Sequence, residues 1–117
     1  MFPEISITKT TSPRKKPEVG QPLPFGRNFT DHMFVMDYVR GQGWINPRIV
    51  PYAPISIEPA AMVFHYGQAV FEGLKAYRTK DGKVVCFRPD LNASRMADSC
   101  RRLEMPVFPE DKFIEAV

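Results

Sequence analysis

Residues 65–77 read HYGQAVFEGLKAY, and residues 87–96 read FRPDLNASRM. Two apolar runs, 74–78 and 83–87, overlap these stretches and lie on either side of the tripeptide KDG. Asp-Gly between two such runs is a strong short-range signal for a β-hairpin. We therefore expect a β-hairpin over these two runs.

A helix is expected directly after this hairpin. Pro89 and Asp90 suit its first turn, because proline lacks the N–H that has no partner there and an acidic side chain favours the positive end of the helix dipole. Pro106 ends the helix. Apolar side chains recur at i, i+3, i+4, i+7 and i+10 and form one stripe: Ala93, Met96, Ala97, Cys100 and Leu103. The sequence predicts a second helix over 109–117.

The chain changes character at Asn28, after a proline-rich segment. Residues 1–24 carry five of the twelve prolines, so we expect an extended arm that lies along another surface. Residues 32–50 are rich in β-branched and aromatic side chains around a Gly-Gln-Gly turn, and they predict a second hairpin. A short strand at 54–57 and one or two helical turns at 61–69 complete the elements. Residues 25–117 are then one α+β domain, a small antiparallel sheet with flanking helices.

The composition suits one packed domain. The chain has 117 residues, 44% of them hydrophobic, and a formal net charge of +3. The densest basic run is Arg14-Lys15-Lys16, which is too short to indicate nucleic-acid binding. No stretch approaches the roughly 20 apolar residues of a membrane span, and no secretory signal is evident, so we expect a cytoplasmic protein. Cys86 and Cys100 match no metal-site spacing and fit free thiols.

Arg95 is the side chain with the most informative chemistry. It lies about 135° around the helix from the centre of the apolar stripe. One interpretation is a solvated polar face. The other is an anion site, since a guanidinium stays charged and binds phosphate oxygens with a planar fork. His32 and His65 have no nucleophile motif beside them, so we expect them, like Asp31 and Glu72, to be structural.

The segments HYG, FEGLKAY and FRPxxNxxRM together resemble the small-domain signature of the branched-chain amino acid aminotransferases. These are fold-type IV enzymes that use pyridoxal phosphate. The resemblance runs from about residue 25 to residue 117 and includes FGRNFTDHM at 25–33. It implies a parent enzyme that moves the amino group of Leu, Ile or Val to 2-oxoglutarate. It also implies that this chain is most of the small N-terminal domain, incomplete at its C-terminus, of a homodimer that has a further large domain.

The resemblance also implies roles for individual residues. Arg95 would bind the cofactor phosphate. Tyr66 and Phe71 would line the pocket for the substrate side chain, and Gly73 would let the backbone approach the substrate closely. Phe25 matches a further pocket aromatic. Judged by spacing alone, Tyr66 and Phe71 fit a core more readily than a pocket. An apolar wall is nevertheless what a branched aliphatic substrate needs, because its recognition rests on burial of methyl groups.

The lysine that holds the cofactor in this family lies in the large domain, and only 22 residues follow Arg95 here (117 minus 95). We therefore assign no catalytic residue and no metal ligand within the chain. Two alternatives stay open. One is another fold-type IV enzyme, such as a D-amino acid aminotransferase or an aminodeoxychorismate lyase. The other is a non-catalytic binding or assembly module with exposed apolar surface.

On this basis we expect the 117 residues alone to be inactive and to bind no cofactor covalently. Borohydride reduction in the presence of pyridoxal phosphate should attach no stoichiometric pyridoxyl group to any one of the seven lysines, because none of them stands in the family's lysine motif. Peptide mass spectrometry measures the labelling. One fully labelled lysine would contradict the expectation.

Overall fold

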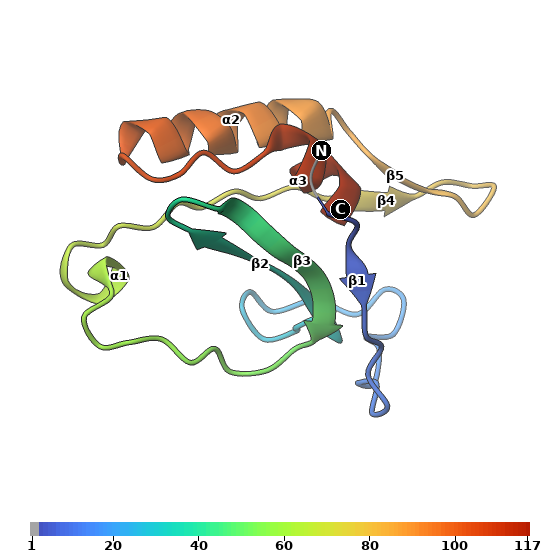
Figure 1. Ribbon diagram of the computed structural model, residues 1–117. Coiled ribbons are helices and arrows are strands. Elements are labelled where there is room, and N and C mark those ends of the chain that lie inside the picture. The colour runs from blue at the N-terminus through green and yellow to red at the C-terminus, as the bar shows by residue number, and fades with distance from the viewer. Residues whose placement is uncertain (1–2) are drawn as a thin grey trace. The chain divides into compact units, whose positions relative to one another are not determined.

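The computed structural model describes residues 3–117 and has an α+β architecture (Figure 1). The chain forms two compact units, one ending at Ile55 and the other running from Ser56 to Val117. The regular structure described in the first unit consists of strands, whereas the second unit combines helices with a two-stranded hairpin. The expected α+β class is confirmed.

The first unit is built around the predicted hairpin. β2 (His32–Val39) and β3 (Gly43–Pro51) pair antiparallel, and the Tyr38 and Trp44 rings meet edge to face with centroids 5.4 Å apart. β1 (Ser6–Ile7) pairs with the other edge of β3 in parallel, which gives the strand order β1-β3-β2. The expectation of a purely antiparallel sheet is therefore wrong, because a proline-free part of the arm supplies a parallel edge strand.

A β-bulge accommodates a proline in the central strand of this sheet. The register shifts between Val35 and Asp37 of β2, opposite Asn46 and Pro47 of β3. Asp37 accepts hydrogen bonds from Asn46 Nδ2 at 3.1 Å and from Arg48 Nη1 at 2.7 Å, and the Arg48 bond is the main cause that lowers the pKa of Asp37. Proline has no N–H for the ladder, so a bulge is where a central strand can hold one.

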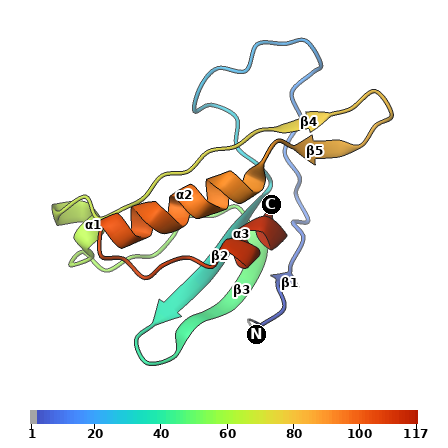
Figure 2. The same cartoon turned by 90° about the horizontal axis from the view of Figure 1, so that it is seen from above.

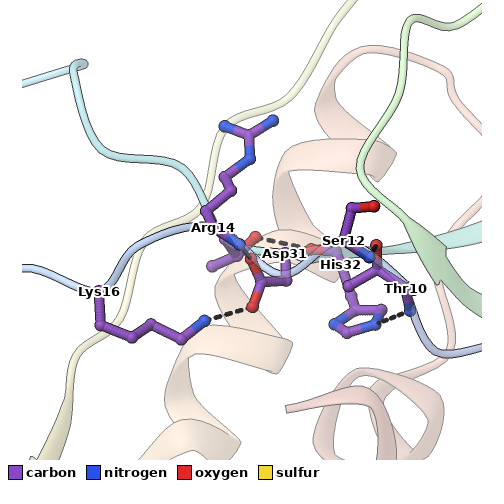
Figure 3. A network of polar contacts seen from close by, with 7 residues as sticks. Thr10, Ser12, Arg14, Lys16, Asp31 and His32 are labelled. Atoms are coloured by element: carbon purple, nitrogen blue, oxygen red, sulfur yellow. Dashed lines mark hydrogen bonds and ion pairs between the residues drawn. The ribbon is translucent and has the colours of Figure 1, made fainter.

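Polar contacts fasten the arm to the start of β2 (Figure 3). The Thr10 N–H donates to His32 Nε2 at 2.9 Å, and the Arg14 N–H donates to Asp31 Oδ1 at 2.8 Å. Lys16 forms an ion pair with the second oxygen of Asp31 and is the main cause that lowers the pKa of this carboxyl. His32 and Asp31 therefore have structural roles, as the sequence analysis expects.

The second unit contains the remaining elements, which lie where the sequence predicts them. They are α1 (Met62–His65), β4 (Ala76–Arg78), β5 (Val84–Cys86), α2 (Pro89–Arg102) and α3 (Glu110–Ala116). The strand expected at 54–57 is wrong. Backbone pairing in the first unit ends where the Tyr52 N–H donates to the Asp31 carbonyl, and residues 53–57 are exposed without a ladder. An apolar extended run is a strand only where another strand pairs with it.

The stripe on α2 supplies most of the fully buried side chains of this unit. Ala93, Ala97 and Cys100 are 2%, 0% and 2% exposed, and Met96 is half-buried. Leu103 lies one residue beyond the helix and is 40% exposed, because α2 ends at Arg102. α3 packs against α2. Small side chains on the stripe leave room for close approach but bury little apolar area each.

The structure also bears on membranes, metals and disulfides. Among residues 3–117, no helix has the length and apolar character of a membrane span. The same residues contain no cluster of three His, Cys, Asp or Glu side chains that could hold a metal ion. Cys86 and Cys100 are free thiols, as expected.

Candidate functional site

An extended segment, residues 68–73, runs antiparallel to α2 (Figure 2). Gln68 Nε2 donates to the Leu103 carbonyl at 2.9 Å, at the C-terminal end of the helix. At the other end, Asn92 Nδ2 donates to the Gly73 carbonyl at 3.0 Å. Side-chain hydrogen bonds, and not strand pairing, thus hold residues 68–73 alongside α2.

The Glu72 carboxylate is the centre of this contact. It forms a bidentate ion pair with Arg95, with Nε to Oε2 at 2.7 Å and Nη2 to Oε1. Oε1 also accepts hydrogen bonds from Asn92 Nδ2 at 2.8 Å and from the Gly73 N–H at 2.9 Å. These donors, Arg95 foremost, lower the pKa of Glu72 to about 2 from its ordinary 4.5. The carboxylate is therefore charged throughout the neutral range.

Arg95 presents the other side of this pair to solvent. Its side chain is 66% exposed, whereas the Glu72 side chain is 5% exposed. Nη1 has no hydrogen-bond partner among residues 3–117, so the Nη1–Nη2 edge of the guanidinium stays available. Arg95 lines an open hollow together with Phe87, Arg88, Leu91 and Asn92. Charged, outward-facing donors of this kind can bind an oxyanion.

A second hollow lies on the same helix, toward its C-terminal end. Phe71 lines it with Ala69, Val70, Ser99, Arg102 and Leu103. Phe71 is 89% exposed, and Tyr66, the residue that follows α1, is 83% exposed. Neither aromatic side chain belongs to the buried core of the unit. Their role as walls of a substrate pocket stays a prediction.

Gly73 and Phe25 are the other two predicted substrate residues. A Cβ at Gly73 would lie 3.6 Å from the Phe71 ring, which is ordinary contact, so the local fold does not itself demand a glycine here. Phe25 belongs to the first unit, in a turn where the Arg27 N–H donates to the Pro24 carbonyl at 3.2 Å, and it is fully exposed. Both assignments stay predictions.

Sequence reasoning missed the partnership of Glu72, which was expected only to be structural, and the supporting role of Asn92. The two partners of the ion pair are 23 residues apart, and no helical spacing links them. A usable signal was present, because the predicted hairpin over 74–87 returns the chain on itself and brings its flanks together. Arg88 was also missed. It lines the same hollow as Arg95 and pairs with Asp90 at 2.9 Å.

Relatives of known function match this chain closely. It is 56% identical over 97% of its length to the branched-chain-amino-acid transaminase 1 of Bacillus subtilis, of which it covers 32%. It is 53% identical over 80% of its length to the branched-chain-amino-acid aminotransferase of Mycolicibacterium smegmatis, of which it covers 25%. The chain is a homologue of the branched-chain amino acid aminotransferases. No model of a protein family matches it.

The match to branched-chain amino acid aminotransferases extends over the full chain in another case. A probable enzyme of this name from Staphylococcus epidermidis is 49% identical over all 117 residues, which cover 32% of it. The chain spans about a third of the length of such relatives. The resemblance inferred from the quoted segments is confirmed.

The Glu72–Arg95 pair predicts a specific pH dependence of stability. A carboxyl whose pKa is lowered on folding stabilises the protein above its ordinary pKa, and the effect is lost as the pH falls toward the folded-state pKa. In the full natural protein without cofactor, Glu72→Gln should therefore be destabilising by a constant amount from pH 7 to about pH 5. The difference from wild type should shrink between pH 4.5 and about 2, the two pKa values of Glu72.

Urea unfolding at a series of pH values measures this difference. Glu58→Gln is the matched control, because Glu58 is exposed and forms no ion pair with any residue that the structure describes. Its difference from wild type should stay flat. A Glu72→Gln difference that is also flat from pH 7 to pH 2 would show that the ion pair does not stabilise the folded protein.

Proposed function

We propose that the protein containing this chain is a branched-chain amino acid aminotransferase, which transfers the amino group of leucine, isoleucine or valine to 2-oxoglutarate. The single observation that supports this most is the similarity to such enzymes over 97% of the chain. The available guanidinium edge of Arg95, in a hollow of the second unit, is consistent with it. Pyridoxal phosphate is the cofactor that this proposal requires, and when bound it withdraws electrons from the substrate α-carbon.

The residues present fit the phosphate end of this cofactor. Arg95 offers Nη1 and the second N–H of Nη2 to an oxyanion while Glu72 occupies its other edge. Arg88 adds a second guanidinium to the same hollow. Arg95 would therefore hold the phosphate by charge-assisted hydrogen bonds, which are the stronger class of hydrogen bond.

The rest of the proposal concerns the whole protein. The chain would be part of the small domain of a fold-type IV enzyme, completed by a large domain that supplies the cofactor lysine. The protein would act as a homodimer in the cytoplasm. Tyr66, Phe71 and Phe25 would exclude water and contact the substrate side chain, and Gly73 would allow the backbone to approach it. Activity toward D-amino acids in place of Leu, Ile and Val would favour the D-amino acid aminotransferase alternative.

Arg95→Ala tests the phosphate assignment. In the full natural protein it should weaken binding of pyridoxal phosphate by roughly 2–4 kcal/mol, the range for losing a charged hydrogen-bond pair. Absorbance of the retained cofactor after dialysis measures the loss. Arg101→Ala is the matched control, since Arg101 is an exposed arginine of the same helix paired with Asp98. Cofactor retained equally by both variants would refute the assignment.

Arg95→Ala should also lower the melting temperature. Glu72 is nearly buried and would lose the partner that most stabilises its charge. From the sequence alone, Arg95→Ala is expected to leave the fold intact, because Arg95 lies off the apolar stripe. Arg95→Lys separates the two effects, since lysine keeps the charge but lacks the planar fork. It should keep more of the stability than of the cofactor affinity.

Phe71→Ala tests the pocket. If Phe71 contacts the substrate, kcat/KM for leucine in the full natural protein should fall about 10- to 100-fold, or about 1.4–2.7 kcal/mol. The loss should be smaller for phenylalanine, whose ring can occupy the vacated space. The melting temperature should change little, because Phe71 is 89% exposed. Phe108→Ala makes the same change at a side chain that is only 9% exposed, and should cost about 3–5 kcal/mol of stability.

The two variants therefore have opposite signatures in melting temperature and in the leucine-to-phenylalanine rate ratio. An unchanged ratio together with a large fall in melting temperature for Phe71→Ala would place Phe71 in the protein core instead of the pocket.

A further inference from the structure

We propose that Glu72 is a positioning residue for the cofactor: its carboxylate fixes the Arg95 guanidinium so that the Nη1–Nη2 edge is presented to the phosphate of pyridoxal phosphate. The inference rests on the proposed function, because it concerns the same site. It assigns a role to a residue whose sequence context indicates only a structural one.

The geometry of the ion pair supports this role. A guanidinium has five N–H groups on a rigid plane, arranged as two side-by-side edges and one further donor. Glu72 takes one complete edge, with Oε2 on Nε at 2.7 Å and Oε1 on Nη2. Binding at that edge fixes the plane of the group and its rotation. The opposite edge then has a defined direction.

The carboxylate is itself held from two sides. Asn92, one turn before Arg95 on α2, donates to Oε1 at 2.8 Å, and the Gly73 N–H donates to the same oxygen at 2.9 Å. Asn92 Nδ2 also contacts the Gly73 carbonyl at 3.0 Å. The Glu72 side chain is 5% exposed, whereas that of Arg95 is 66% exposed. A nearly buried carboxylate therefore holds one edge of an exposed guanidinium.

Arg88 provides a contrast in the same hollow. It also donates two hydrogen bonds to one carboxylate, from Nε to Asp90 Oδ1 at 3.1 Å and from Nη2 to Asp90 Oδ2 at 2.9 Å. Both side chains of that pair are more than half exposed, at 55% and 60%, and the partners are two residues apart. Such an exposed ion pair contributes little and fixes the Arg88 guanidinium only weakly. The buried, hydrogen-bonded carboxylate is specific to Arg95.

Two effects of Glu72 on phosphate binding oppose each other. Its negative charge repels a phosphate, whereas its hold on Arg95 removes the side-chain freedom that binding would otherwise have to restrict. The Arg95 fork projects into solvent, where water and salt screen the repulsion. The ordering of a rotamer-rich side chain is not screened. We therefore expect the positioning effect to prevail at physiological ionic strength.

The experiment compares two ligands that differ only in the phosphate. Dissociation constants for pyridoxal phosphate and for pyridoxal are measured with the full natural protein freed of cofactor, at 0.15 M salt as in the physiological case. Glu72→Gln keeps the shape of the side chain but loses the charge. It should reduce the preference for pyridoxal phosphate over pyridoxal about 10-fold, while pyridoxal itself binds within about twofold of wild type.

Controls and a double-mutant cycle isolate the pair. Asp98→Asn removes the charge from the equivalent partner of Arg101 on the same helix and should leave the preference unchanged. In an Arg95→Ala background, Glu72→Gln should have no further effect on the preference, because Glu72 acts through Arg95. Asn92→Ala, which frees the carboxylate without breaking the pair, should reduce the preference by a smaller factor. This variant tests the inference if Glu72→Gln does not fold.

The outcomes separate this inference from the proposed function. If Arg95→Ala lowers the preference and Glu72→Gln leaves it unchanged or raises it, the positioning role is wrong and the phosphate assignment stands. Equal weakening of both ligands by Glu72→Gln also overturns the role, because it shows a merely structural residue. If Arg95→Ala itself leaves the preference unchanged, the phosphate assignment fails and the positioning role fails with it.

Discussion

The ion pair between Glu72 and Arg95 is the interaction on which the candidate site depends. Residues 68–73 pair with no strand. Side-chain contacts join them to α2 and the residue after it: Asn92 donates to the Gly73 carbonyl, and Gln68 donates to the Leu103 carbonyl. Glu72 contacts Arg95 in the first half of α2, whereas its neighbour Phe71 is 89% exposed and lines a hollow near the C-terminal end of the helix. The ion pair thus joins the segment that carries both Glu72 and Phe71 to the helix that carries Arg95.

The parts of the fold that the sequence predicted are those encoded within short stretches. Asp-Gly and Gly-Gln-Gly turns specify both hairpins, and the stripe of small apolar residues with Pro89 specifies α2. β1 could not be predicted, because a two-residue strand gains its definition only from pairing with residues about 42 positions away, as Ser6 does with Arg48. The strand expected at 54–57 failed for the converse reason: the local pattern was present but no partner strand was.

In the candidate site, too, features encoded locally could be predicted and those that depend on distant contacts could not. Arg95 could be singled out through its resemblance to a phosphate-binding arginine, whereas its place on the polar face of α2 by itself favours a solvated residue. Glu72 was not recognised as its partner, since the pair is closed by the hairpin of β4 and β5 and not by helical spacing. The exposure of Phe71 and Tyr66 also contradicts the usual reading of aromatic residues as core, and in this unit the buried stripe is made of Ala93, Ala97 and Cys100 instead.

The charge balance of the hollow determines how it can recognise an anion. Arg88 and Arg95 each share a carboxylate, of Asp90 and Glu72, so the four side chains have no net charge. Long-range attraction by excess positive charge is therefore weak here, and recognition must rest on the direction of N–H donors at short range. Direction is defined only where the partner carboxylate is itself fixed, as Glu72 is by Asn92 and the Gly73 N–H. A rigid guanidinium fork within a neutral ion pair would favour a ligand with a tetrahedral oxyanion at a set position over anions in general, because it would give little affinity to a charge that is not correctly placed.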